Sequence, residues 1–149
     1  MKFLRFLVVA IALTAALPLA AANPNHAFSQ SLAQGYTEIA KFAVANLHDE
    51  SGQSYFQNKS DRAQANFPVE PEWPTNWTLA PDLQQIMGRE RDGLMTALAR
   101  VDAGADPKTG AIAQVNFDCW VALSSVPTMQ KESTRCRNAF HAAMQQLGS

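Results

Sequence analysis

The sequence predicts an all-α protein, a small bundle of four to five helices. Apolar residues recur at helical spacing through most of the chain, and no segment of useful length alternates apolar and polar residues as a strand does. The length agrees with one domain, because about 127 residues follow a 22-residue leader, close to the commonest domain size. We therefore expect a signal peptide at residues 1–22 and a single helical domain at residues 23–149.

The leader has the three parts of an export signal. Lys2 and Arg5 form a basic start, residues 6–19 are an apolar run, and three alanines at 20–22 offer small residues to a signal peptidase. A retained membrane anchor is the alternative. The run is shorter than the roughly 20 residues that cross a bilayer, so cleavage is favoured. We expect an exported chain that does not span a membrane after cleavage.

The charge balance of the exported part excludes one class of partner. Without Lys2 and Arg5, ten basic residues remain against thirteen acidic ones, a formal charge of −3. Phosphate binding needs clustered positive charge, so nucleic acid is not an expected partner. The same balance argues against attraction to an anionic membrane surface.

The first half of the domain predicts one clear helix and one weaker helix. A helix over residues 29–47 follows from apolar residues at helical spacing: Phe28, Leu32, Tyr36, Ile39, Ala43 and Leu47. Gly35 inside it costs about 1 kcal/mol relative to alanine. Tyr55, Phe56 and Ala63 indicate the weaker helix, which ends before Phe67.

Residues 68–81, which we call the strap, are expected to be extended and irregular. Prolines stand at positions 68, 71, 74 and 81, and each disfavours helix in the residue before it. Trp73 and Trp77 lie among them, so the segment is interpreted either as a cover over the helical core or as a proline-rich ligand for an aromatic groove. The first reading is favoured because no basic anchor accompanies the prolines. Trp73 and Trp77 are the candidate partner-binding residues.

A third helix is expected at residues 81–103. Its apolar stripe runs through Leu83, Ile86 with Met87, Leu94, Leu98 and Val101. Gly104 falls where a left-handed C-terminal cap is expected. Asp106 and Pro107 then suit the N-cap and the first position of the next helix.

The last two helices carry the two cysteines of the chain, Cys119 and Cys136. Each cysteine falls within an apolar stripe, and consecutive antiparallel helices touch along such stripes. A disulfide between them would link a C-terminal helical hairpin and contribute about 3 kcal/mol by closing a loop of about 17 residues. Redox exchange, covalent haem and zinc binding lack their usual spacings.

The cysteine segment resembles part of a known family. The stretches VNFDCWV at residues 115–121 and CRNAF at residues 136–140 are similar to the FDCW and CRxxF pattern in the N-terminal helical region of alphaproteobacterial OmpA-family envelope proteins. LAQGY at residues 32–36 and the strap around Trp77 are also similar to that region. The resemblance implies a periplasmic or secreted protein of the Gram-negative cell envelope. The aspartate and arginine with which the OmpA-like domain of those proteins contacts peptidoglycan have no counterpart here.

The sequence contains no residue set that we assign to catalysis, to a cofactor or to a metal. His48 beside Asp49 and Glu50 could hold a metal weakly, but a histidine at a helix C-terminus more often stabilises the helix dipole. Glu90 and Asp92 point to different faces of a helix and are better explained, with Arg89 and Arg91, as a solvated, ion-paired surface. We expect no cofactor and no enzymatic activity.

Two functions fit these observations. The first is a non-enzymatic, disulfide-linked helical protein that binds another envelope component, either an envelope protein or a peptidoglycan-associated component. The second is a periplasmic carrier of a lipid or another small apolar ligand, for which the five methionines and eight phenylalanines would provide a pliable cavity.

Overall fold

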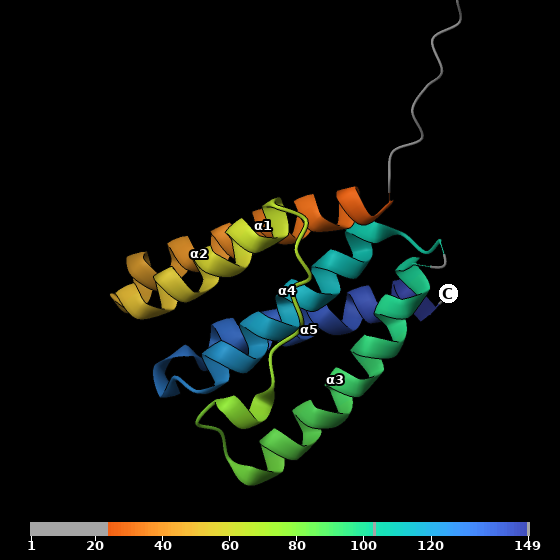
Figure 1. Cartoon of the computed structure of the whole chain (residues 1–149). Helices are drawn as coiled ribbons and strands as arrows, with labels where there is room; N and C mark the ends of the chain where they lie inside the picture. The colour runs from red at the N-terminus through yellow and green to blue at the C-terminus, as the bar shows by residue number, and fades with distance from the viewer. Residues whose placement is uncertain (1–23, 103, 149) are drawn as a thin grey trace, which may run out of the picture.

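Five α-helices carry the fold in the computed structural model, which describes residues 24–102 and 104–148 (Figure 1). Their bounds are Pro24–Phe42 (α1), Glu50–Gln64 (α2), Pro81–Asp102 (α3), Pro107–Ser124 (α4) and Gln130–Gly148 (α5). Short helical turns follow α1, interrupt the strap and precede α5, at Ala43–Leu47, Pro74–Asn76 and Pro127–Met129. No strand occurs within the described ranges, so the all-α prediction is confirmed. The predicted signal peptide lies outside these ranges.

The helices form two antiparallel hairpins and one crossing helix. α1 pairs with α2, α4 pairs with α5, and the hairpins join where α1 packs on α4. α3 lies across α4 and α5 on the other side of this central pair (Figure 1). The strap connects α2 to α3 and passes over α4 (Figure 1). It therefore lies between the two outer helices, α2 and α3.

Local residue chemistry places the helix ends. Asp49 begins α2 by accepting a hydrogen bond from the backbone N–H of Gly52 (2.9 Å), and Asp106 caps α4 by accepting one from Thr109 (2.9 Å). Gly104 follows α3 with φ of 111°, in the region that favours glycine. The predicted cap at Gly104 and the predicted start of α4 are therefore confirmed.

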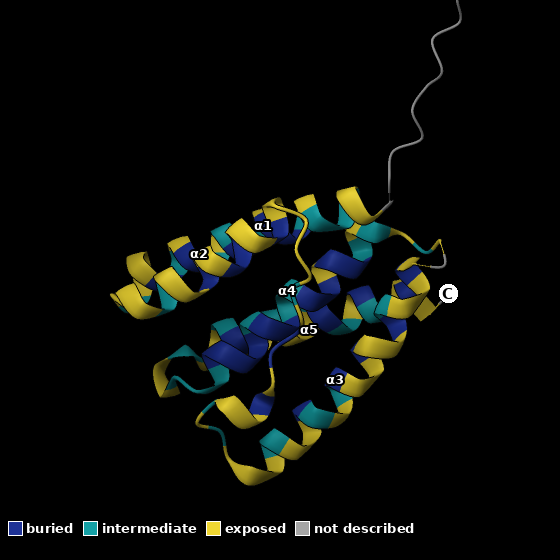
Figure 2. Cartoon of the chain, in the orientation of Figure 1, coloured by how far each residue is buried: buried dark blue, intermediate teal, exposed yellow. Residues whose placement is uncertain are grey.

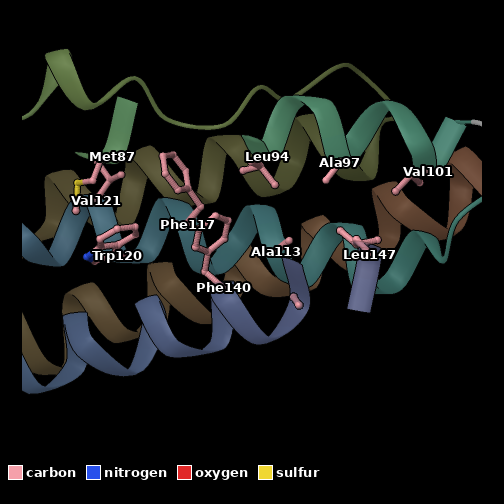
Figure 3. Close-up of a cluster of buried hydrophobic side chains, with 11 residues drawn as sticks. Met87, Leu94, Ala97, Val101, Ala113, Phe117, Trp120, Val121, Phe140 and Leu147 are labelled. Atoms are coloured by element: carbon pink, nitrogen blue, oxygen red, sulfur yellow. The ribbon is translucent and has the colours of Figure 1, made fainter. Parts of the chain in front are cut away.

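The main core lies between α3, α4 and α5, and Figure 3 shows its side chains converging from these three helices. Its buried members include three large side chains in mutual ring contact, Phe117, Trp120 and Phe140. A second core joins α1, α2 and α4 around Leu32, Tyr36 and Phe56. α4 belongs to both cores and is the most buried helix in Figure 2.

α4 is buried on several sides, so its buried residues do not fall on a single apolar stripe. Ile112, which lies two helical turns before Cys119 on the same stripe, is 50% exposed, whereas Phe117 and Val121 are completely buried. A related correction applies to α3, where Ile86 is 41% exposed and its neighbour Met87 carries the contact with the core.

The two cysteines form the predicted disulfide. Cys119 of α4 and Cys136 of α5 are bonded, with Cα atoms 5.8 Å apart and a sequence separation of 17. The disulfide-linked C-terminal hairpin is therefore confirmed.

Candidate functional site

The strap is held against the helices by a buried polar network that begins at Lys59 on α2. Its ammonium group donates to the carboxylates of Glu72 and Asp118 and to the backbone carbonyl of Glu70 (3.1 Å). A lysine has three N–H donors, so all of them are used within the protein. Lys59 therefore joins α2, α4 and the strap at one point.

Asp118 on α4 forms the floor of this network and is completely buried. One carboxylate oxygen accepts from Lys59 (2.7 Å) and from the hydroxyl of Tyr36 (2.7 Å), and the other accepts from the backbone N–H of Glu72 (2.8 Å). Gln114 donates to the Tyr36 hydroxyl (3.0 Å) and to the carbonyl of Val69 (2.7 Å). Among the described residues, no buried side-chain nitrogen or oxygen lacks a partner.

Glu72 closes the network from the strap side. Its carboxylate accepts from Tyr55 (2.9 Å and 3.0 Å) and from the indole N–H of Trp77 (2.9 Å), besides Lys59. Trp77 is partly buried and contacts the rings of Tyr55 and Phe56. Trp77 thus fastens the strap to α2, which gives this tryptophan a structural role.

Burial and neighbouring charges shift the pKa values of these groups. It raises the pKa of Asp118 to about 6, although Lys59 partly opposes the shift. Burial alone would lower the pKa of Lys59, but the carboxylates of Asp118 and Glu72 outweigh it and the pKa lies above its ordinary value, so the ammonium stays charged. Burial, aided by nearby carboxylates, also raises the pKa of Tyr36 and Tyr55.

Arg91 of α3 holds the strap from the opposite side. Arg91 is 4% exposed, and its side chain donates to the carbonyls of Pro71 (3.3 Å) and Glu72 (3.1 Å). The prediction that Arg91 belongs to a solvated surface is therefore wrong, because the strap covers it and supplies its hydrogen-bond acceptors. Arg89 and Asp92 are exposed as predicted.

Trp73 stands at the outer edge of this arrangement. The guanidinium carbon of Arg91 lies 3.5 Å from the centre of its ring, which fixes one face by a cation–π contact. Trp73 is still 51% exposed. Trp73 and Trp77, grouped together by sequence, therefore differ: one is available at the surface and the other is tied into the network.

An open cavity of about 500 Å³ lies beside Trp73, between α2 and the strap. We call it the strap cleft and define its wall by Tyr55, Asn58, Arg62, Trp73 and Asn76. Lys59 and Glu72 form part of its floor. The buried network thus builds the floor of a surface cleft.

The remaining candidates from sequence stay apart from the cleft. His48 ends the helical turn after α1 with a left-handed backbone, and His141 of α5 lies 3.3 Å from Glu90. Within residues 24–102 and 104–148, no three histidine, cysteine, aspartate or glutamate side chains gather as a metal site. Over the same ranges, no helix has both the length and the hydropathy to cross a membrane.

Sequence reasoning missed the charged members of the network, Lys59, Glu72 and Asp118, although one signal was present. Phe56, Lys59 and Ala63 follow each other at intervals of three and four, so Lys59 lies on the buried face of α2. A lysine on such a face needs a buried anionic partner. The sequence does not show where that partner lies, because Asp118 is 59 residues away.

Comparisons with protein-family models, curated proteins and solved structures found no match to this chain.

Proposed function

We propose that this chain is an exported, non-enzymatic protein of the Gram-negative cell envelope that binds another envelope component through the strap cleft. The proposal combines the export signal at residues 1–22, the resemblance of the cysteine segment to OmpA-family N-terminal regions, and the surface that the strap presents. The Cys119–Cys136 disulfide is compatible with an oxidising compartment.

The exposure of Trp73 is the observation that carries this proposal. A tryptophan buries more area on binding than almost any other side chain, and tryptophan, tyrosine and arginine dominate the energetics of interfaces. Trp73, Tyr55 and Arg62 meet at one cleft, and the first two are 51% and 48% exposed. The network beneath them holds the strap in place before a partner arrives, which lowers the entropic cost of binding.

A photo-crosslinking residue at position 73 tests the proposal in cells that make the protein. The matched control places the same residue at Ile112, which is 50% exposed on α4 and does not line the cleft. We expect one discrete adduct with an envelope component from position 73 and none from position 112. Equal adducts from both positions, or none from either, would contradict the proposal.

The carrier hypothesis has its own candidate cavity. A groove of about 340 Å³ runs between α1, α4 and α5 and is lined mainly by apolar groups, among them Ile39, Phe42, Val115 and Leu123. Native mass spectrometry of the purified protein tests this second function. A co-purifying lipid mass that is lost on Glu38→Trp, which adds a large side chain at an exposed position lining the groove, would favour the carrier over the binding protein.

A further inference from the structure

The strap cleft offers a ligand almost no net charge. Lys59 is paired with Glu72 and Asp118, and the exposed carboxylate of Glu70 is paired with Arg91 (3.5 Å). The charged residues that line the cleft, Lys59 and Arg62 against Glu70 and Glu72, sum to zero. A phosphate or polyanion needs surplus positive charge, which this lining does not provide. The chemistry therefore favours a neutral ligand.

The wall of the cleft combines aromatic faces with unused amide groups. Arg91 covers one face of Trp73, so the exposed part of that ring is its other face and edge. In the described part of the chain, the side-chain amides of Asn58 and Asn76 have no partner, and both residues are exposed. Arg62 uses one N–H on the carbonyl of Pro68 and keeps other donors for a ligand.

A pyranose ring matches these groups. Its C–H bonds carry partial positive charge and are attracted to the negative face of an aromatic ring, while its hydroxyl groups both donate and accept. An amide side chain also does both, so Asn58 and Asn76 can pair with hydroxyl or acetamido groups in either sense. A purely apolar ligand that covered these amides would remove their water without replacing its hydrogen bonds, which is unfavourable.

We propose that the strap cleft binds a neutral oligosaccharide, with a sugar ring stacked on the free face of Trp73 and hydrogen-bonded by Asn58, Asn76 and Arg62. The cavity volume of about 500 Å³ falls within the range of roughly 300–1,000 Å³ usual for small-molecule sites. This inference rests on the proposed function, since it names the chemistry of the envelope component.

Titration calorimetry of the oxidised, purified protein with two probes tests the proposal. The probes are the β-1,4-linked tetramer of N-acetylglucosamine and cellotetraose, which lacks acetamido groups. We expect saturable binding of at least one. Preference for the first would indicate an acetamido-bearing glycan such as the sugar backbone of peptidoglycan, and equal binding would indicate a general hexose chain.

Variants assign the binding to the cleft. Trp73→Ala should weaken binding tenfold or more and Asn76→Ala severalfold, with melting temperature measured for both. Phe67→Ala is the matched control, because Phe67 is 61% exposed just before the strap and does not line the cleft. It should bind as the wild type does.

Three results would overturn the saccharide proposal: no saturable binding of either sugar, undiminished binding by a folded Trp73→Ala variant, or binding of an unglycosylated cell-wall peptide in place of both sugars. If photo-crosslinking at position 73 still captured an envelope component, the proposed function would stand while the saccharide inference failed. If crosslinking failed as well, both would fail.

Discussion

The ammonium group of Lys59 lies 2.7 Å from the carboxylate of Asp118, although the two residues are 59 positions apart in sequence. This contact joins α2 to α4 beneath the strap, and Glu72 of the strap completes it. A lysine and two carboxylates placed here are stable only together, since each alone would be a buried, uncompensated charge. The position of the strap therefore depends on this pair.

Replacing Lys59 by methionine keeps most of the side-chain volume and removes the charge. We expect Lys59→Met to lower the free energy of unfolding by about 3–5 kcal/mol, because Asp118 and Glu72 lose their cation. Urea denaturation measures the change. Lys41→Met is the control: Lys41 pairs with Glu38 at the surface, where its side chain is 67% exposed, and its loss should cost less than about 1 kcal/mol. Equal effects of the two variants would contradict the role of Lys59.

The carboxyl of Asp118 gives a pH prediction with a definite sign. Burial raises its pKa in the folded protein to about 6 from an ordinary value of 3.8, so between these values the folded state keeps a proton that the unfolded state has released. Its contribution to the free energy of unfolding therefore falls as the pH rises from about 4 to about 6.

Denaturation of the wild type and of Asp118→Asn across this range measures the effect. The wild type should lose stability relative to the variant as the pH rises. Asp92→Asn, at an exposed position, controls for the loss of one carboxylate. A wild type that gains stability relative to Asp118→Asn as the pH rises would show that the sign is wrong.

Gly35 allows α1 to approach α4 closely. A Cβ added at Gly35 would lie 2.6 Å from a methyl carbon of Val115, a contact that requires the helices to move apart. We expect Gly35→Ala to destabilise the protein by about 1–3 kcal/mol despite the better helix propensity of alanine. Gly88→Ala on α3 is the matched substitution, since no atom lies within 4 Å of its added Cβ, and it should stabilise by up to about 1 kcal/mol. Thermal unfolding that ranks the two variants the other way would contradict this packing.

The disulfide between Cys119 and Cys136 should add to stability by restricting the unfolded chain. Replacing both cysteines by serine opens a loop of 17 residues, and we expect a loss of about 3 kcal/mol. The wild-type protein unfolded in reductant is the internal control and should match the double variant. An unchanged melting temperature would mean that the bond contributes little.

The elements that depend on local chemistry could be predicted from sequence. The proline spacing indicated the irregular strap, Gly104 and Asp106 indicated the turn between α3 and α4, and apolar stripes placed both cysteines on facing helices. Each signal lies within a few residues of the structure that it determines, so no knowledge of the fold was needed.

The candidate site depended on long-range partners and was predicted only in part. Trp73 was identified from sequence. Its role differs from that of Trp77 because Arg91 stacks on Trp73, whereas Glu72 accepts a hydrogen bond from Trp77. Charge made Arg91 look like a surface residue, and Lys59 was not singled out, because lysine and arginine are almost never buried without a partner. Their partners lie on the strap and on α4, and only the folded arrangement shows them.

Co-sedimentation of the purified protein with isolated cell envelopes tests the central claim, binding through the strap cleft, most directly. The comparison needs three proteins: the wild type, Trp73→Ala and the matched variant Phe67→Ala. We predict that the wild type and Phe67→Ala bind the envelopes equally and sediment with them. Trp73→Ala should remain in the supernatant even when ten times more envelope material is added. Sedimentation of a folded Trp73→Ala variant at the wild-type level would contradict the claim.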